Sequence, residues 1–238
     1  MNKILNITAF LFLCIVTATS CKKDSKGVSF VTTYAEVELD GAGTVFSQIG
    51  QPFTDPGYSA KEGDKDITSA VVVKSNIDIT KAGIYSVSYA ATNSDGFTSA
   101  ATRTVVVCDK TAPLNGYYRS NIFRDNNGTT SSRGPYTVLV FGTGNDQYYV
   151  QDLLGRWYDV GSAYGAAYAG SGIVKLNGDN TFTLVSSNAL GFGPTSAPKI
   201  ETVSTYTPAT KTIVLNTIMG DTPTMHFKVT LSNPQPLN

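Results

Sequence analysis

Short runs of alternating apolar and polar residues fill the chain, and this pattern favours β-strands over helices. In the clearest run, residues 84–91, Tyr85, Val87 and Tyr89 fall on one face and the small residues between them fall on the other. β-Branched and aromatic residues recur in such runs, whereas helix-forming residues never accumulate over a window long enough for an extended helix. We therefore expect an all-β protein.

The N-terminal half is predicted to form one β-sandwich, over residues 30–108. Turn-forming sequences at 55–57 (Asp-Pro-Gly) and 93–96 (Asn-Ser-Asp-Gly) separate the alternating runs. Strands are expected at 33–39, 70–74, 84–91 and 97–107. Short strands at this spacing indicate a sandwich of roughly seven strands.

Spaced motifs in this region resemble a known module. They are Gly50, Phe53, Asp55-Pro56-Gly57-Tyr58 and Ala60, then Asp66-Ile67-Thr68, then Gly83, Tyr85, Val87 and Tyr89, and finally Asp95-Gly96 and Arg103-Thr104-Val105. In this order they resemble the bacterial immunoglobulin-like (Ig-like) domain that repeats in surface proteins and occurs in some insecticidal crystal proteins. The resemblance implies an Ig-like sandwich that serves as a spacer or adhesive unit, and it brings no catalytic residues with it.

A second all-β domain is expected over residues 114–238, after a linker at 109–113. Pro113 breaks the strand pattern in this linker, and the scarcity of glycine there indicates a short, stiff joint. Beyond the linker, strands are predicted at 116–124, 135–141, 147–152, 173–176, 181–185, 200–206, 211–217 and 226–231. About eight antiparallel strands joined in this way would form a barrel or a sandwich.

The first 20 residues have the pattern of a secretory signal peptide. Lys3 precedes a short apolar stretch at 4–16, and the small residues at 18–20 stand where a peptidase cuts. The apolar stretch is shorter than the ~18–20 residues that span a bilayer. Cys21 follows directly, and small residues ending in a cysteine resemble the lipobox of bacterial lipoproteins. The resemblance implies lipidation of Cys21, with ordinary secretion and a free cysteine as the alternative.

Residues 21–29 would then comprise the lipidated cysteine and a solvated, lysine-containing tether. The sequence Cys-Lys-Lys-Asp after such a leader resembles lipoproteins of the Bacteroidota, which implies an outer-membrane lipoprotein that faces the cell exterior. Such lipoproteins carry two or three acyl chains. Because each buried methylene contributes about 0.8 kcal/mol, anchoring by several chains is stable. The membrane is therefore an expected partner through the N-terminal lipid.

Charge and cysteine content exclude several classes of function. Removal of residues 1–20 takes one of the 18 basic residues and none of the 18 acidic ones, so the mature chain has 17 against 18. A near-neutral chain without a basic block lacks the clustered cations that nucleic acids require. Cys14 leaves with the leader and Cys21 takes lipid, so Cys108 has no internal partner and is expected to be a small buried side chain.

A glycine-punctuated segment of the second domain, residues 153–170, concentrates aromatic residues and is the candidate binding site. Its candidate ligand-binding residues are Trp157, Tyr158, Tyr164 and Tyr168, flanked by Arg156 and Asp159. Aromatic rings on a loop can stack on the apolar faces of sugars while charged neighbours bind the hydroxyl groups. The alternative is that these rings plug the end of the barrel, which is the usual role of a single tryptophan.

The spacing of chemical groups defines no catalytic or metal site. His226 is the one histidine, and it stands in an alternating run where a half-exposed strand residue is expected. The sequence has no paired Cys or His motif and no phosphate-binding loop, and Asp55, Asp64 and Asp66 are interpreted as turn residues rather than calcium ligands. We therefore expect no enzyme, cofactor or metal. A cryptic glycoside hydrolase would need two acids of the second domain to face one cleft.

The order of these parts favours a binding protein. A lipid anchor, an Ig-like spacer and an aromatic-bearing β-domain together resemble the outer-membrane lipoproteins of Bacteroidota carbohydrate-utilisation systems. The resemblance implies capture of glycan at the cell surface by the second domain, with polysaccharide and a surface transporter complex as partners. A structural or adhesive surface lipoprotein without a small ligand is the alternative.

Overall fold

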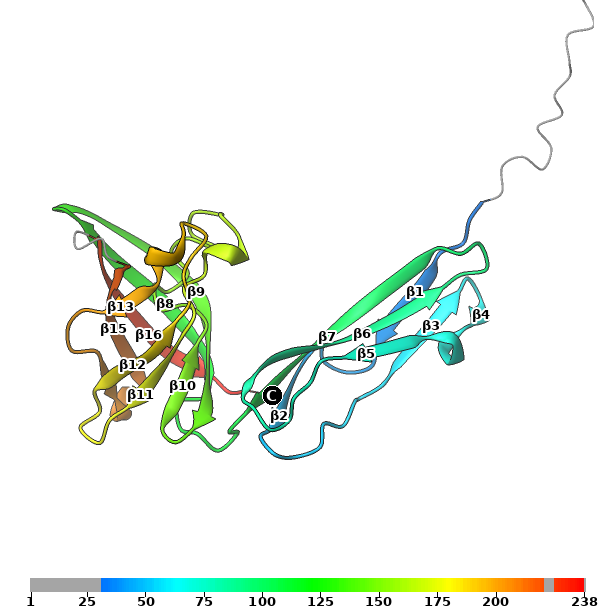
Figure 1. Cartoon of the computed structure of the whole chain (residues 1–238), viewed down its shortest axis with the longest axis horizontal. Helices are drawn as coiled ribbons and strands as arrows, with labels where there is room; N and C mark the ends of the chain where they lie inside the picture. The colour runs from blue at the N-terminus through cyan, green and yellow to red at the C-terminus, as the bar shows by residue number, and fades with distance from the viewer. Residues whose placement is uncertain (1–30, 221–224, 238) are drawn as a thin grey trace, which may run out of the picture.

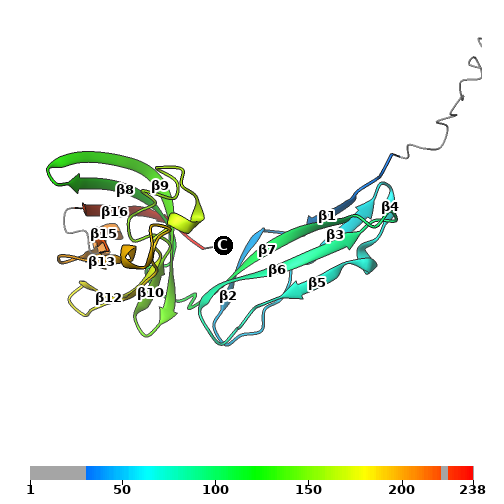
Figure 2. The ribbon, with the colours of Figure 1, turned by 45° about the horizontal axis from the view of Figure 1, so that its top comes forward.

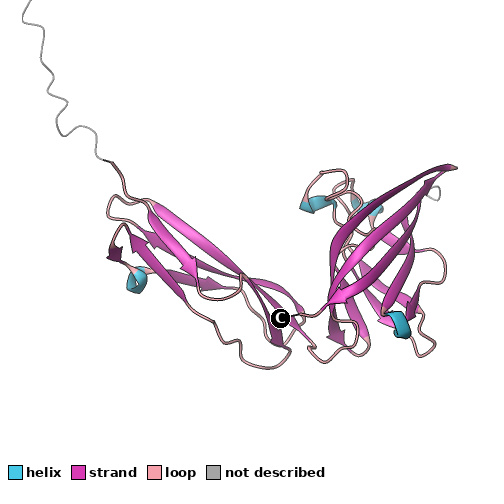
Figure 3. Cartoon of the chain, turned by 180° about the vertical axis from the view of Figure 1, so that it is seen from behind, coloured by secondary structure: helices cyan, strands magenta, loops and turns pink. Residues whose placement is uncertain are grey.

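The computed structural model describes residues 31–220 and 225–237, which form two β-domains that follow one another along the chain (Figure 1). Strands dominate both domains, and the helices within the described residues are short 3₁₀ turns (Figure 3). None of those helices has the length and apolar character to cross a membrane. The all-β prediction is confirmed. The expected signal peptide, the lipidation site at Cys21 and the tether lie outside the described residues.

The first domain is a sandwich of two sheets, with strand orders β1-β3-β4 and β2-β7-β6-β5. Its strands span Ala35–Leu39 (β1), Thr44–Gln48 (β2), Tyr58–Glu62 (β3), Lys65–Asp66 (β4), Val72–Ser75 (β5), Gly83–Thr92 (β6) and Thr98–Cys108 (β7). β2 runs parallel to β7. Val87 and Tyr89 of β6 are buried together with Val105 and Val107 of β7, and Tyr85 packs against them. The face predicted for β6 is therefore confirmed.

Acids of the turns in this domain hold local structure. Asp66 accepts a 2.8 Å hydrogen bond from the backbone N–H of Thr68, and a 3₁₀ turn then occupies Thr68–Ala70. The strand expected at 70–74 consequently begins only at Val72. Asp55 accepts the backbone N–H of Gly57 at 3.0 Å and lies 3.3 Å from the buried guanidinium of Arg103, so it fixes the turn at 55–57.

The second domain is one antiparallel sheet of nine strands that curls into a nearly closed barrel. The strands span Gly116–Asn126 (β8), Thr129–Gly144 (β9), Gln147–Val150 (β10), Gly172–Leu176 (β11), Phe182–Ser187 (β12), Pro198–Ile200 (β13), Thr205–Thr207 (β14), Thr212–Met219 (β15) and Met225–Gln235 (β16). The sheet order is β12-β11-β10-β9-β8-β16-β15-β13, with β14 also on β15. The hydroxyl of Ser187 on β12 donates to the carbonyl of Pro198 on β13 at 2.6 Å, so the first and last strands of this order almost meet.

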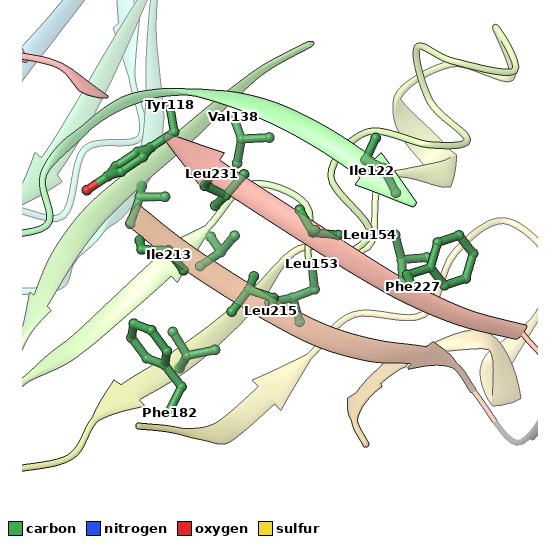
Figure 4. Close-up of a cluster of buried hydrophobic side chains, with 14 of the residues drawn as sticks. Tyr118, Ile122, Val138, Leu153, Leu154, Phe182, Ile213, Leu215, Phe227 and Leu231 are labelled. Carbon is green, nitrogen blue, oxygen red and sulfur yellow. The ribbon is translucent and has the colours of Figure 1, made fainter. Parts of the chain in front are cut away.

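Alternate side chains of these strands fill the barrel. The core includes Tyr118 and Ile122 from β8, Leu215 from β15 and Phe227 from β16 (Figure 4). Burial of each such side chain contributes about 1.5–3 kcal/mol. The segment between β10 and β11 adds two leucines to this core, and these fix its position across one end of the barrel.

Apolar side chains from both domains pack together at the joint between them. Phe46 and Cys108 of the first domain form a small apolar cluster with Leu139 and Phe141 of β9. The ring of Phe46 lies 6.1 Å from that of Tyr117, in an edge-to-face arrangement. Cys108 is fully buried there, as predicted, and burial raises the pKa of its thiol to about 11. The thiolate form that reacts with electrophiles is therefore disfavoured.

Candidate functional site

The segment 151–170 is built on a buried carboxyl group. Asp152 is fully buried, and its Oδ1 accepts the backbone N–H of Leu154 at 2.7 Å. Its other oxygen has no hydrogen-bond partner among the described residues. Burial raises the pKa of Asp152 to about 7. Leu153 and Leu154 then enter the core, which ties the segment to the barrel (Figure 4).

Trp157 lies inside the barrel end and does not face solvent. Its side chain is only 1% exposed and packs edge-to-face on Phe227, with ring centroids 5.8 Å apart. The guanidinium groups of Arg124 and Arg133 lie 4.7 Å and 4.3 Å from the centroid of its ring. The structure corrects the expectation for this residue, because a tryptophan enclosed by a phenylalanine and two arginines offers no open face to a sugar.

Tyr158 is also mostly enclosed. It is 7% exposed, burial raises the pKa of its phenol, and its hydroxyl lies 3.6 Å from the sulfur of Met225. Its ring centroid is 5.0 Å from that of Phe192 and 6.3 Å from that of Tyr164. Tyr158 therefore supports the rings around it and is not itself an open platform, which corrects its expected role.

Three further rings reach the surface above Tyr158. Tyr164 is 54% exposed and Phe192 is 47% exposed, while Tyr168 is half-buried. Phe192 contacts both tyrosines edge-to-face, with centroids 6.1 Å and 4.8 Å away. We call the four residues Tyr158, Tyr164, Tyr168 and Phe192 the aromatic rim.

Phe192 was not among the residues predicted from sequence. It comes from the segment after β12, and it stands between Gly191 and Gly193. A Cβ at Gly191 would lie 2.9–3.1 Å from ring atoms of Tyr168, so only glycine allows this close approach. A lone phenylalanine between two glycines was the available signal.

Arg156 and Asp159 form a pair with each other. Both Nε and one terminal nitrogen of Arg156 lie 2.8 Å from Oδ2 of Asp159, and Oδ1 of Asp159 accepts the N–H of Val160 at 2.7 Å. Arg156 also donates to the carbonyl of Thr137 on β9 at 3.3 Å. These contacts brace the segment against the barrel. The predicted flanking groups are thus close to the rim, and most of their polar atoms are already engaged.

A separate cleft of about 260 Å³ holds the histidine and two acids. Nδ1 of His226 lies 2.7 Å from Glu201, and Asp125 accepts the N–H of Gly128 at 2.7 Å. His226 is half-exposed on a strand, as expected. Two carboxylates in one cleft meet the minimum composition of a glycoside hydrolase, but both already have partners here. Within the described residues, no group of three or more His, Cys, Asp or Glu is placed to hold a metal ion.

Family comparisons agree with this two-domain architecture. Residues 37–107 match the family described as "Bacterial surface protein, Ig-like domain". Residues 108–233 match a family whose description reads "-like, C-terminal domain". The predicted Ig-like module is therefore confirmed. No curated protein matches the chain.

A solved structure shows the family to which the chain belongs. The crystal structure of the lipoprotein BT2262 from Bacteroides thetaiotaomicron is 32% identical in sequence and has a TM-score of 0.68. The match covers 84% of this chain and 100% of that chain. The chain therefore belongs to the family of this Bacteroides lipoprotein, as the leader and the Ig-like module predicted.

More distant structures also match, but they support no functional argument. One contains the M60 catalytic domain with CBM51-1 and CBM51-2 from Clostridium perfringens ZmpB, at 24% identity and a TM-score of 0.27. Another contains CBM51-2 in complex with GlcNAc and INT domains of the same protein, at 16% identity and a TM-score of 0.28. The matches cover 49% and 86% of this chain and 14% and 45% of those chains.

Proposed function

We propose that the protein is a lipid-anchored surface protein that captures glycan with the aromatic rim. The observation that carries the proposal is the exposure of Tyr164 and Phe192 side by side at one end of the barrel, with their ring centroids 6.1 Å apart. A contiguous patch of exposed rings is typical of a ligand-binding surface, and flat aromatic faces suit the apolar faces of sugar rings.

The rim is held firmly enough to serve as a binding surface. Tyr158 supports Tyr164 and Phe192 from below, and hydrogen bonds from Ser120, Arg133 and Thr217 to backbone carbonyls of the segment tie it to the barrel. A preorganised platform loses little conformational entropy when a ligand binds. Backbone carbonyls and the hydroxyls of Tyr164 and Tyr168 would provide the polar contacts that orient sugar hydroxyls.

The proposed location follows from the order of the parts. A lipid on Cys21 would place the tether nearest to an outer membrane, the Ig-like domain next and the barrel last. The joint around Phe46 is close to the start of β8, whereas the arginines beside the rim are at the end of β8 and the start of β9. The rim therefore lies at the opposite end of the β8–β9 hairpin from the joint. We propose that it faces the cell exterior, within reach of polysaccharide and a transporter complex.

Glycan-array binding of residues 22–238 tests the proposal. We expect Tyr164→Ala and Phe192→Ala each to weaken binding by about tenfold, since loss of one good aromatic contact costs about 1 kcal/mol or more. Phe97→Ala is the matched control, because Phe97 is 49% exposed but lies in the Ig-like domain. A wild-type protein that retains no glycan, or equal losses in rim and control variants, would contradict the proposal.

A structural or adhesive role is the second candidate. The burial of Trp157 and most of Tyr158 favours it, since these two aromatics stabilise the barrel end rather than contact a ligand. If the rim variants lose glycan retention only because they unfold, as shown by a large fall in melting temperature, the rings are part of the core and this role is preferred.

A further inference from the structure

A groove runs along the outer face of β16, β8 and β9, and none of the rim residues lines it. These three strands lie side by side (Figure 2). Two clefts, of about 310 Å³ and about 500 Å³, open on this face. The first is lined in part by Gly134 and the second by Pro135, so the clefts adjoin at this peptide.

Irregular pairing creates the groove. The register of β8 against β9 shifts between Ser120 and Ile122, and the register of β16 against β8 shifts between Ser232 and Gln235. Gly134 stands opposite the first shift with φ of 114°, and a Cβ there would lie 2.5 Å from the carbonyl oxygen of Ser120. Bulges of this kind bend strands and turn side chains away from their regular positions. The groove is thus a feature of the backbone itself.

The groove exposes two positive charges, those of Arg119 and Lys228, whereas the guanidinium of Arg133 is directed at Trp157. No Asp or Glu lines these two clefts, and Asp125 and Glu201 line the neighbouring cleft, which shares Phe123 and Lys228 with the groove. The side chains of Arg119 and Lys228 are exposed, and neither forms an ion pair with a carboxylate in the described part of the chain. In a chain of zero formal net charge, such a groove is complementary to an anion.

The remaining lining suits a sugar chain. Phe123 is 46% exposed and stands opposite Lys228 in the register, while Asn121 stands opposite Thr230. Arg119, Asn121 and Phe123 alternate along β8, so about 13 Å separates the first from the last. The exposed phenyl ring, the amide and the guanidinium of these three residues form a row that can contact successive units of one extended ligand.

We propose that this groove is a second binding site, for a linear acidic saccharide whose units carry carboxylates. Arg119 binds one carboxylate through its guanidinium, Phe123 stacks on the apolar face of a sugar ring, and Lys228 neutralises the charge of a neighbouring unit. Amide and hydroxyl side chains between them bind ring hydroxyls. The site shares no residue with the aromatic rim, so the proposal does not depend on glycan capture there.

Calorimetric titration of residues 22–238 with tetrasaccharides of galacturonate, glucuronate, mannuronate and guluronate tests the inference. At least one is expected to bind at low salt, with an affinity that falls as salt is added. The methyl ester of the same tetrasaccharide should bind about tenfold more weakly, because it keeps the shape and loses the charge. Arg119→Gln and Lys228→Gln should each cause a loss of about tenfold, and Phe123→Ala a similar loss.

Two control variants locate the site. Lys175→Gln removes an exposed cation of β11 and should leave affinity unchanged, as should Tyr164→Ala on the rim. Failure of all four tetrasaccharides to bind overturns the proposal, and so does an equal loss in Lys175→Gln. Loss of uronate binding in Tyr164→Ala would show that uronates bind at the rim and would overturn the proposal of a second site. Equal competition by an acidic peptide would show that charge alone is recognised.

Discussion

The guanidinium of Arg133 lies 4.3 Å from the centroid of the Trp157 ring and donates a 2.9 Å hydrogen bond to the Trp157 carbonyl oxygen. The same nitrogen donates to the hydroxyl of Ser162 at 2.6 Å. One strand residue therefore contacts the side chain, the backbone and the following turn of the segment that carries the aromatic rim. Arg124 of β8 contacts the indole as well, so Trp157 joins this segment to both long strands.

Replacement of Trp157 by alanine should destabilise the barrel. We expect a loss of about 3–5 kcal/mol in the free energy of unfolding, because a large buried side chain leaves a cavity and two arginines lose their cation–π partner. Trp157→Phe should lose less, since a ring remains. Urea unfolding followed by circular dichroism measures both. A loss below about 1 kcal/mol for the alanine variant would contradict the buried role of Trp157.

The buried carboxyl of Asp152 should make stability depend on pH. Its pKa is raised from 3.8 to about 7 by burial, so the folded state binds the proton more tightly than the unfolded state. The stability that this proton provides is fully present below pH 3.8 and is lost as pH rises through about 7. The difference is on the order of a few kcal/mol.

Asp152→Asn isolates this effect, because the amide keeps the shape and cannot titrate. The wild type should lose stability relative to the variant between about pH 4 and pH 7 in paired urea titrations. Contributions from exposed acids such as Asp66 and Asp179, whose pKa values are lowered by hydrogen bonds from threonines, cancel in the comparison. Parallel stability curves for the two proteins across this pH range would refute the assignment.

The sequence predicted the fold because alternation is a local property. The face of Val87 and Tyr89 could be read from neighbouring residues, and it is buried as expected. The sequence did not predict the strand β2, because its single partner, β7, is more than 50 residues away and pairs with it in parallel. Long-range pairing of one short edge strand leaves little trace in its own sequence.

The site was predicted only in part, for a similar reason. Aromatics in a glycine-rich segment can point either way, and the direction of Trp157 depends on arginines of β8 and β9 that precede it by more than 20 residues. Tyr164 reaches the surface, but its neighbour Phe192 arrives from a distant segment. The charged neighbours Arg156 and Asp159 satisfy each other, which a spacing of three residues permits but does not require.

The joint between the domains should resist cleavage until its apolar cluster is disturbed. The backbone N–H of Lys110 donates to the side chain of Gln48 at 2.8 Å, and its ammonium group lies 3.4 Å from the carbonyl of Phe46. Phe46→Ala should loosen these contacts and speed trypsin cleavage after Lys110 about tenfold or more, because local opening exposes the bond. Phe97→Ala, remote from the joint, is the control. Equal cleavage rates in both variants would show that the cluster does not hold the linker.

Two glycines of the rim segment should respond differently to the same substitution. Gly155 and Gly165 both have positive φ, at 69° and 89°. A Cβ at Gly155 would lie 2.6 Å from Oγ of Ser120 and 2.8 Å from a methyl group of Val229, whereas nothing lies within 4 Å of one at Gly165. Gly165→Ala therefore adds only backbone strain, of about 1–3 kcal/mol, because φ of 89° and ψ of 176° lie in a region that almost only glycine adopts.

Gly155→Ala adds steric overlap to the strain of a positive φ and should cost more than Gly165→Ala, about 3 kcal/mol or more in the free energy of unfolding. The overlap pushes the segment away from β8 and β16, so the variant should also weaken any ligand that binds the aromatic rim, while Gly165→Ala retains binding. Thermal unfolding of both variants, followed by glycan titration below their melting temperatures, measures the two effects. Equal destabilisation by the two substitutions would mean that the segment does not pack on the barrel as closely as Gly155 requires.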